Sequence, residues 1–221
     1  MKMNAISGRL AGWLGLGVCV TFFAMVEPVR ADFSLYTNGP VEITDNAWAI
    51  SGPLAVSNSF TLSGTSTVAV IDGIGLICLA DSLPESFTWS MGTTEFGGEI
   101  TGPNVTTPIV TKIGTTTGGY DVFTATIDTG NIDLAAGTYW FSLAGGTTSL
   151  GAGHEIYWTQ TSGASDAFQQ DGSNTPQSVP SESFTIEGVP EPSTVALTGV
   201  GAVLLAFAVR RRVARDLRRT A

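Results

Sequence analysis

The middle of the chain alternates between polar and large apolar residues, which is the two-residue period of a β-strand with one buried face. In residues 86–91, Phe87, Trp89 and Met91 alternate with serine and threonine, so these three side chains are predicted to share a face. The same alternation is found at residues 59–62, 138–143 and 183–186. Residues 68–79 are predicted to form two buried strands joined by a tight turn at Asp72-Gly73.

Glycine pairs such as Gly97-Gly98 and Gly118-Gly119 separate these runs and divide the body into about nine or ten short strands. This spacing predicts an all-β domain over residues 32–187, an antiparallel β-sandwich with a jelly-roll-like topology. Residues 160–179 contain few large apolar side chains and are predicted to form a long surface loop.

The N-terminal segment has the three parts of a secretory signal. Lys2 and Arg9 precede an uncharged, apolar stretch over residues 10–26, and Ala31 supplies a small residue for cleavage before Asp32. Residues 1–31 are therefore predicted to be a signal peptide, exported by the Sec machinery and removed by signal peptidase. Two alternatives stay open, an uncleaved anchor helix and a lipoprotein signal at Cys19.

The C-terminal segment is apolar and then strongly basic. Residues 194–209 contain no charge and are predicted to form a transmembrane helix, although sixteen residues span only about 24 Å of a hydrocarbon core of about 30 Å. Arg210, Arg211 and Arg212 open a basic tail over residues 210–221, which is predicted to be retained on the cytoplasmic side.

A proline-rich linker over residues 188–193 precedes this helix and contains Pro190, Glu191 and Pro192. Prolines two residues apart favour an extended backbone that a processing enzyme can bind. The Pro-Glu-Pro sequence, the apolar helix and the arginine-rich end together resemble the PEP-CTERM sorting signal. This resemblance implies that the three linker residues are a sorting motif recognised by an exosortase, a membrane-embedded enzyme. Residues 33–187 also resemble the bodies of other bacterial PEP-CTERM proteins.

Charge and side-chain chemistry narrow the possible functions. Residues 32–193 contain 17 of the 19 acidic residues but a single Lys, which argues against nucleic acid as a partner. His154 has no second histidine at metal-binding spacing, and Cys78 is predicted to be a buried thiol without a disulfide partner. No cofactor is predicted. Bound Ca²⁺ stays open without identified ligands, and residues 171–174 only superficially resemble a calcium loop.

The sequence thus predicts a non-enzymatic surface or extracellular-matrix protein. It would be exported across the inner membrane, transiently anchored there, and delivered to the cell surface or matrix in association with exopolysaccharide. The alternative is a carbohydrate-binding module displayed by the same route, because tryptophans on a β-sandwich can stack on sugars. Trp89 and Trp140 are nevertheless predicted to pack within or between the sheets.

Overall fold

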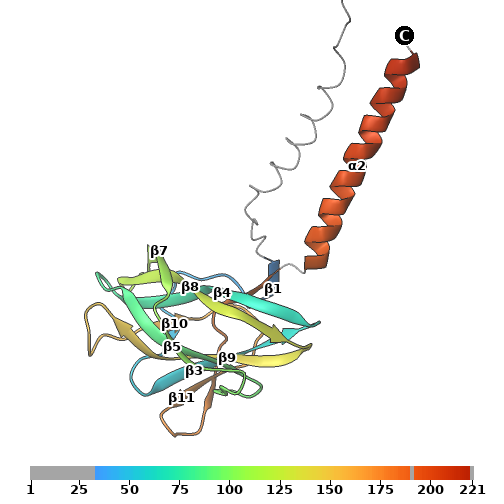
Figure 1. The fold of residues 1–221 in the computed structure, drawn as a ribbon. Helices are drawn as coiled ribbons and strands as arrows, with labels where there is room; N and C mark the ends of the chain where they lie inside the picture. Colours follow the sequence, from blue (N-terminus) through green and yellow to red (C-terminus); the bar gives the residue numbers. More distant parts are fainter. Residues whose placement is uncertain (1–32, 190–191, 220–221) are drawn as a thin grey trace, which may run out of the picture. The chain divides into compact units, whose positions relative to one another are not determined.

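The computed structural model describes residues 33–189 and the helix over residues 192–219, with side chains placed for residues 33–189 and 198–212. The predicted signal peptide over residues 1–31 lies outside the described residues. The described body consists of thirteen β-strands, β1 to β13, arranged in two antiparallel sheets (Figure 1).

The first sheet has the order β1-β13-β4-β8-β7, and the short strands β10 and β2 continue it beside the second half of β4. Its strands are β1 (Phe33–Thr37), β2 (Ala47–Ala49), β4 (Ser66–Leu79), β7 (Ile109–Thr115), β8 (Tyr120–Leu134), β10 (Tyr157–Thr159) and β13 (Thr185–Gly188). The second sheet has the order β12-β11-β3-β9-β5-β6. Its strands are β3 (Leu54–Leu62), β5 (Pro84–Gly92), β6 (Thr101–Thr106), β9 (Gly137–Thr148), β11 (Ala167–Asp171) and β12 (Gln177–Val179).

The two sheets pack face to face around a single apolar core. Phe141 of the second sheet contacts Trp158 of the first edge-to-face, with ring centroids 5.5 Å apart. Phe184, between the sheets at the start of β13, lies 5.7 Å from Phe141 and 6.3 Å from Phe60. The predicted burial of Phe87, Trp89 and Met91 on one face is confirmed, and so is the all-β prediction of two antiparallel sheets.

The prediction of two strands within residues 68–79 is wrong, because β4 runs without interruption from Ser66 to Leu79. Asp72 and Gly73 together oppose the single residue Thr126 of β8, which is a β-bulge. Gly73 adopts a left-handed φ of 61°, which is accessible to glycine without steric cost. The Thr126 hydroxyl donates to Asp72 Oδ1 at 2.5 Å, so the polar pair is absorbed into the strand instead of ending it.

The prediction of a long loop over residues 160–179 is also wrong in part. β11 pairs with β3 over five residues, and β12 folds back on β11 as a hairpin. The strand carries only one large apolar residue, Phe168, and two glutamines, so the alternation that identifies a strand is weak here. β11 forms because its backbone pairs with β3, a partner that the local sequence does not indicate.

Candidate functional site

The segment predicted to direct sorting begins at the last strand of the body. β13 lies between β1 and β4, and Gly188 pairs with Phe33 on one side and Val68 on the other. The next amide, Val189 N, donates to the Thr67 carbonyl oxygen at 3.2 Å. The first residue and the last residue of the described body are therefore held side by side, and the chain is tied to the sheet up to Val189.

A buried polar cluster anchors the segment that leads into β13. Glu182 is fully buried, and its Oε2 accepts a hydrogen bond from Asn58 Nδ2 at 2.6 Å. Its backbone amide donates to Asn58 Oδ1 at 3.1 Å, and its carbonyl oxygen accepts from Asn38 Nδ2 at 2.7 Å. The cluster thus connects the last strand to β3 and to the loop after β1.

The Glu182 carboxyl group sits in an environment that disfavours its charge. Burial raises its pKa to about 8, partly opposed by the hydrogen bond from Asn58. Its second oxygen, Oε1, has no hydrogen-bond partner among the described residues. The side-chain carbonyl oxygens of Asn38 and Asn58 already accept hydrogen bonds from other protein groups. The cluster therefore has a structural role, which is to hold the segment before β13 in place. Sequence reasoning missed it, because a glutamate beside a short strand is ordinarily a surface residue.

The helix α2 (Pro192–Arg219) follows the linker. Pro192 is its first residue, a position where the missing amide costs no hydrogen bond. Arg210, Arg211 and Arg212 are exposed and belong to the same helix, which continues through the predicted tail as far as Arg219. Pro190 and Glu191, and the predicted cleavage residues Ala31 and Asp32, lie outside the described residues.

The prediction of a transmembrane helix over residues 194–209 is not supported. Among the residues that the structure describes, no helix combines the length and the apolar character needed to cross a membrane. In the same helix, the uncharged residues 194–209 are followed directly by Arg210 to Arg212.

The candidate reactive side chains of the body are dispersed. Cys78 is fully buried and free, as predicted, and burial raises the pKa of its thiol to about 11. His154 is half-buried and lies in a turn before β10, where its amide donates to the Gly151 carbonyl oxygen at 3.3 Å. Residues 171–174, the superficial calcium loop, form the turn of the β11–β12 hairpin, in which Asn174 N donates to the Asp171 carbonyl oxygen at 3.0 Å. Within the described residues, no group of three or more His, Cys, Asp or Glu could hold a metal ion.

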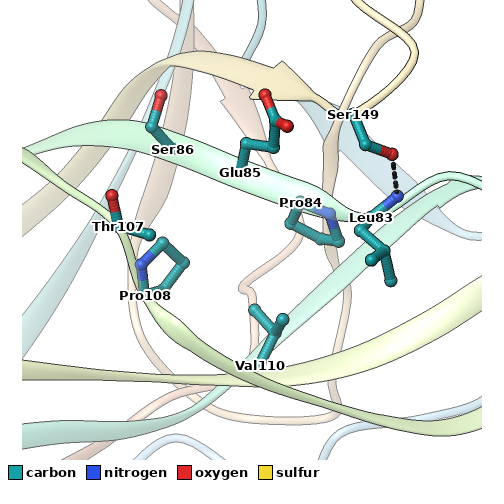
Figure 2. A pocket seen from close by; sticks show the side chains of 8 residues that line it. All are labelled: Leu83, Pro84, Glu85, Ser86, Thr107, Pro108, Val110 and Ser149. Carbon is teal, nitrogen blue, oxygen red and sulfur yellow. Dashed lines mark hydrogen bonds between the residues drawn. The ribbon is translucent and has the colours of Figure 1, made fainter.

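A shallow pocket of about 530 Å³ opens between β5 and the connection from β6 to β7 (Figure 2). Its lining residues are Leu83, Pro84, Glu85, Ser86, Thr107, Pro108, Val110 and Ser149. The Ser149 hydroxyl accepts a hydrogen bond from Leu83 N at 2.9 Å, so it is already engaged. Glu85 is the single charged side chain in this lining, and acid catalysis of glycoside hydrolysis needs two carboxyl groups. The pocket does not contain that pair.

The comparisons with known proteins concern the C-terminal segment alone. Residues 188–212 match the family model of the PEP-CTERM protein-sorting motif, which bears out the resemblance found in the sequence. This match begins at Gly188, the last residue of β13, and ends at Arg212 within α2. No curated protein and no solved structure matches the chain, so the resemblance of residues 33–187 to other bodies has no support from them.

Proposed function

We propose that this chain, whose residues 188–212 carry a PEP-CTERM sorting motif, is a non-enzymatic surface or matrix protein associated with exopolysaccharide. The motif implies export, targeting to an exosortase, and sorting to the cell surface with a transient C-terminal anchor. At the other end of the chain, the Sec machinery exports the protein through its signal peptide, and signal peptidase cleaves between Ala31 and Asp32. Pro190, Glu191 and Pro192 are the residues that the exosortase recognises, and Arg210 to Arg212 retain the C-terminus.

The observation that carries this proposal is the position of the motif relative to the folded body. The motif starts where β13 ends, and Val189 is the last residue of the described body that is hydrogen-bonded to the sheet. An enzyme can therefore act on the chain after Val189 without removing a strand, and the body keeps its core intact after processing.

The order of the strands supports a jelly-roll-like body. β1 pairs with β13, β3 with β9, β4 with β8, and β5 with β6. These pairs are nested from the outside of the sequence inwards, as in one long hairpin that is rolled into two sheets. The ends of the described body come together in this arrangement, since Phe33 of β1 pairs with Gly188 of β13.

Replacement of Glu191 by alanine in the full chain tests the sorting proposal. In the producing bacterium, we expect Glu191→Ala to remain a longer precursor in the membrane fraction, with the processed form at the cell surface reduced at least tenfold. Glu95→Ala, which changes an exposed acidic residue of the body, is the matched control and is expected to be processed normally. The masses of the protein in each fraction decide the outcome. A native protein that keeps its C-terminus wherever it accumulates, together with an unchanged Glu191→Ala variant, would refute the proposal.

A carbohydrate-binding role of the body is the second candidate function. Trp140 and Phe168 favour it, because their rings lie together on the outward face of the second sheet, half-buried and not enclosed in the core.

A further inference from the structure

The outward face of the second sheet is lined by hydroxyl groups. The inward positions of β3, β9 and β5 hold core residues such as Phe60, Phe141 and Trp89, so the alternate positions point outward. Of the hydroxyl residues at those outward positions, Ser57, Ser59 and Ser142 are buried. The exposed or half-buried ones are Thr61, Ser86, Thr88, Ser90 and Thr138. No charged residue occupies an outward position in residues 55–61, 86–90, 138–144 or 168–170.

Two aromatic side chains interrupt this hydroxyl-rich face. Trp140 on β9 and Phe168 on β11 flank β3, whose small residues Ser57 and Ser59 leave room for the rings to meet above the strand. The ring centroids are 5.6 Å apart and the planes are inclined by 47°. Both side chains are half-buried, so each ring packs on the sheet with one part and faces solvent with another.

A strained loop completes the surroundings of this pair. Phe96, in the loop between β5 and β6, has a left-handed φ of 58°, which is unfavourable for an aromatic residue. Its amide donates to the hydroxyl of Ser57, the β3 residue that pairs with Phe168, at 3.2 Å. Glu99 holds the loop by accepting hydrogen bonds from the amide and the hydroxyl of Thr93. Backbone strain of this kind persists where the surrounding structure enforces it, and it is concentrated at binding sites.

We propose that Trp140 and Phe168, with the solvent-accessible hydroxyl groups of the same sheet face, form a binding face for a neutral polysaccharide. The apolar faces of sugar rings stack on aromatic side chains, while sugar hydroxyls exchange hydrogen bonds with serine, threonine and the indole N–H. The Trp140 indole N–H makes no hydrogen bond to another described residue and is accessible to such a partner. The inference deepens the proposed function, on which it rests for the delivery of the body to a polysaccharide-containing environment.

Charge selects a neutral polymer over an anionic one. Residues 33–189 contain fifteen acidic residues against Lys112, and Lys112 is engaged at 2.7 Å with the Asp121 carboxylate. A uronic-acid polymer would meet this negative field without a cationic side chain on the hydroxyl-rich face. Among the described residues, Trp48 is the other half-buried tryptophan, and it differs from Trp140 because its indole nitrogen is buried and has no described partner.

The first test uses the full native chain in detergent and oxidises accessible indoles with N-bromosuccinimide. Hydroxyethylcellulose and dextran are the neutral probes, and alginate is the anionic probe. We expect at least one neutral polymer to slow oxidation of Trp140 at least fivefold while Trp48 is unaffected, as read from peptide masses. Equal oxidation of Trp140 with and without every neutral polymer, or protection by alginate alone, would overturn the proposal.

The second test measures retardation of the chain by the same polymers in native gels. Trp140→Ala and Phe168→Leu are each expected to weaken binding by about tenfold or more, because each removes a stacking ring. Trp140→Tyr is expected to restore much of the binding, and Trp48→Phe is the matched control that leaves it unchanged.

Thermal unfolding of each variant separates lost binding from lost folding, and Phe168→Leu preserves apolar volume for this purpose. Binding that survives both ring removals would refute the site. Neither test depends on C-terminal processing, so a failure here leaves the sorting proposal to the Glu191→Ala experiment.

Discussion

The body and the helix α2 differ in where their large apolar side chains lie. Phe87, Phe141 and Trp158 are enclosed between the two sheets, whereas Leu204, Leu205 and Phe207 of α2 are 64%, 67% and 62% exposed. Burial of apolar surface is the main favourable contribution to folding, so the body carries its own stabilisation. The apolar side chains of α2, in contrast, are exposed on the surface of the helix. The two regions should therefore respond differently to the same chemical change.

The largest difference is expected from truncation of an apolar side chain. Trp89→Ala removes a ring that is 5% exposed, and it should lower the free energy of unfolding of the body by about 3–5 kcal/mol. Leu204→Ala, on the exposed surface of α2, should leave that free energy unchanged. Urea unfolding of the full chain in detergent, followed by tryptophan fluorescence, measures both. A Trp89→Ala variant as stable as the native chain would contradict the placement of Trp89 in the core.

A smaller effect is expected from pH, and it distinguishes the buried Glu182 from carboxylates in solvent. Its pKa is about 8 in the folded body and returns towards 4.5 on unfolding. Because the folded state binds the proton more tightly, this contribution is complete below about pH 4.5 and is lost as the pH rises towards about 8. The loss amounts to a few kcal/mol at most. Unfolding free energies measured between pH 5 and 8.5 should fall with pH.

Glu182→Gln is the control for this pH effect, because the amide keeps the shape of the side chain without a titrating proton. The fall between pH 5 and 8.5 should largely disappear in this variant. Glu95→Gln, an exposed acidic residue, should keep it. An equal pH slope in the native chain and in Glu182→Gln would show that Glu182 is not its source.

The smallest expected effect comes from a single methyl group added to a glycine in each region. Gly73→Ala forces alanine into a left-handed φ of 61° at the β4 bulge and should destabilise the body by about 1 kcal/mol. Gly201→Ala lies on α2, where an added Cβ meets nothing within 4 Å, and it should favour the helix by about 1 kcal/mol. Urea unfolding measures the first change and circular dichroism of α2 the second. A Gly73→Ala variant without loss of stability would argue against the bulge.

Much of the strand content could be predicted because it depends on local alternation. Residues 86–91 place three large side chains on one face whatever their partners are, and all three are buried. β11 could not be predicted in the same way, because its hydrogen bonds come from β3, more than a hundred residues earlier in the chain. The Asp72-Gly73 pair was misinterpreted as a turn for a related reason. The same dipeptide fits a turn or a bulge, and β8 decides between them.

The sequence by itself determined the sorting segment and the all-β class of the body. A sorting motif is read as an ordered string of residues, so Pro190 to Arg212 could be recognised without a fold, and the family match agrees. Only the tertiary structure decided that Glu182 is locked by Asn38 and Asn58, and that Trp140 meets Phe168 across β3. These groups are far apart in the sequence. Their meeting depends on the register of paired strands that are distant in the chain.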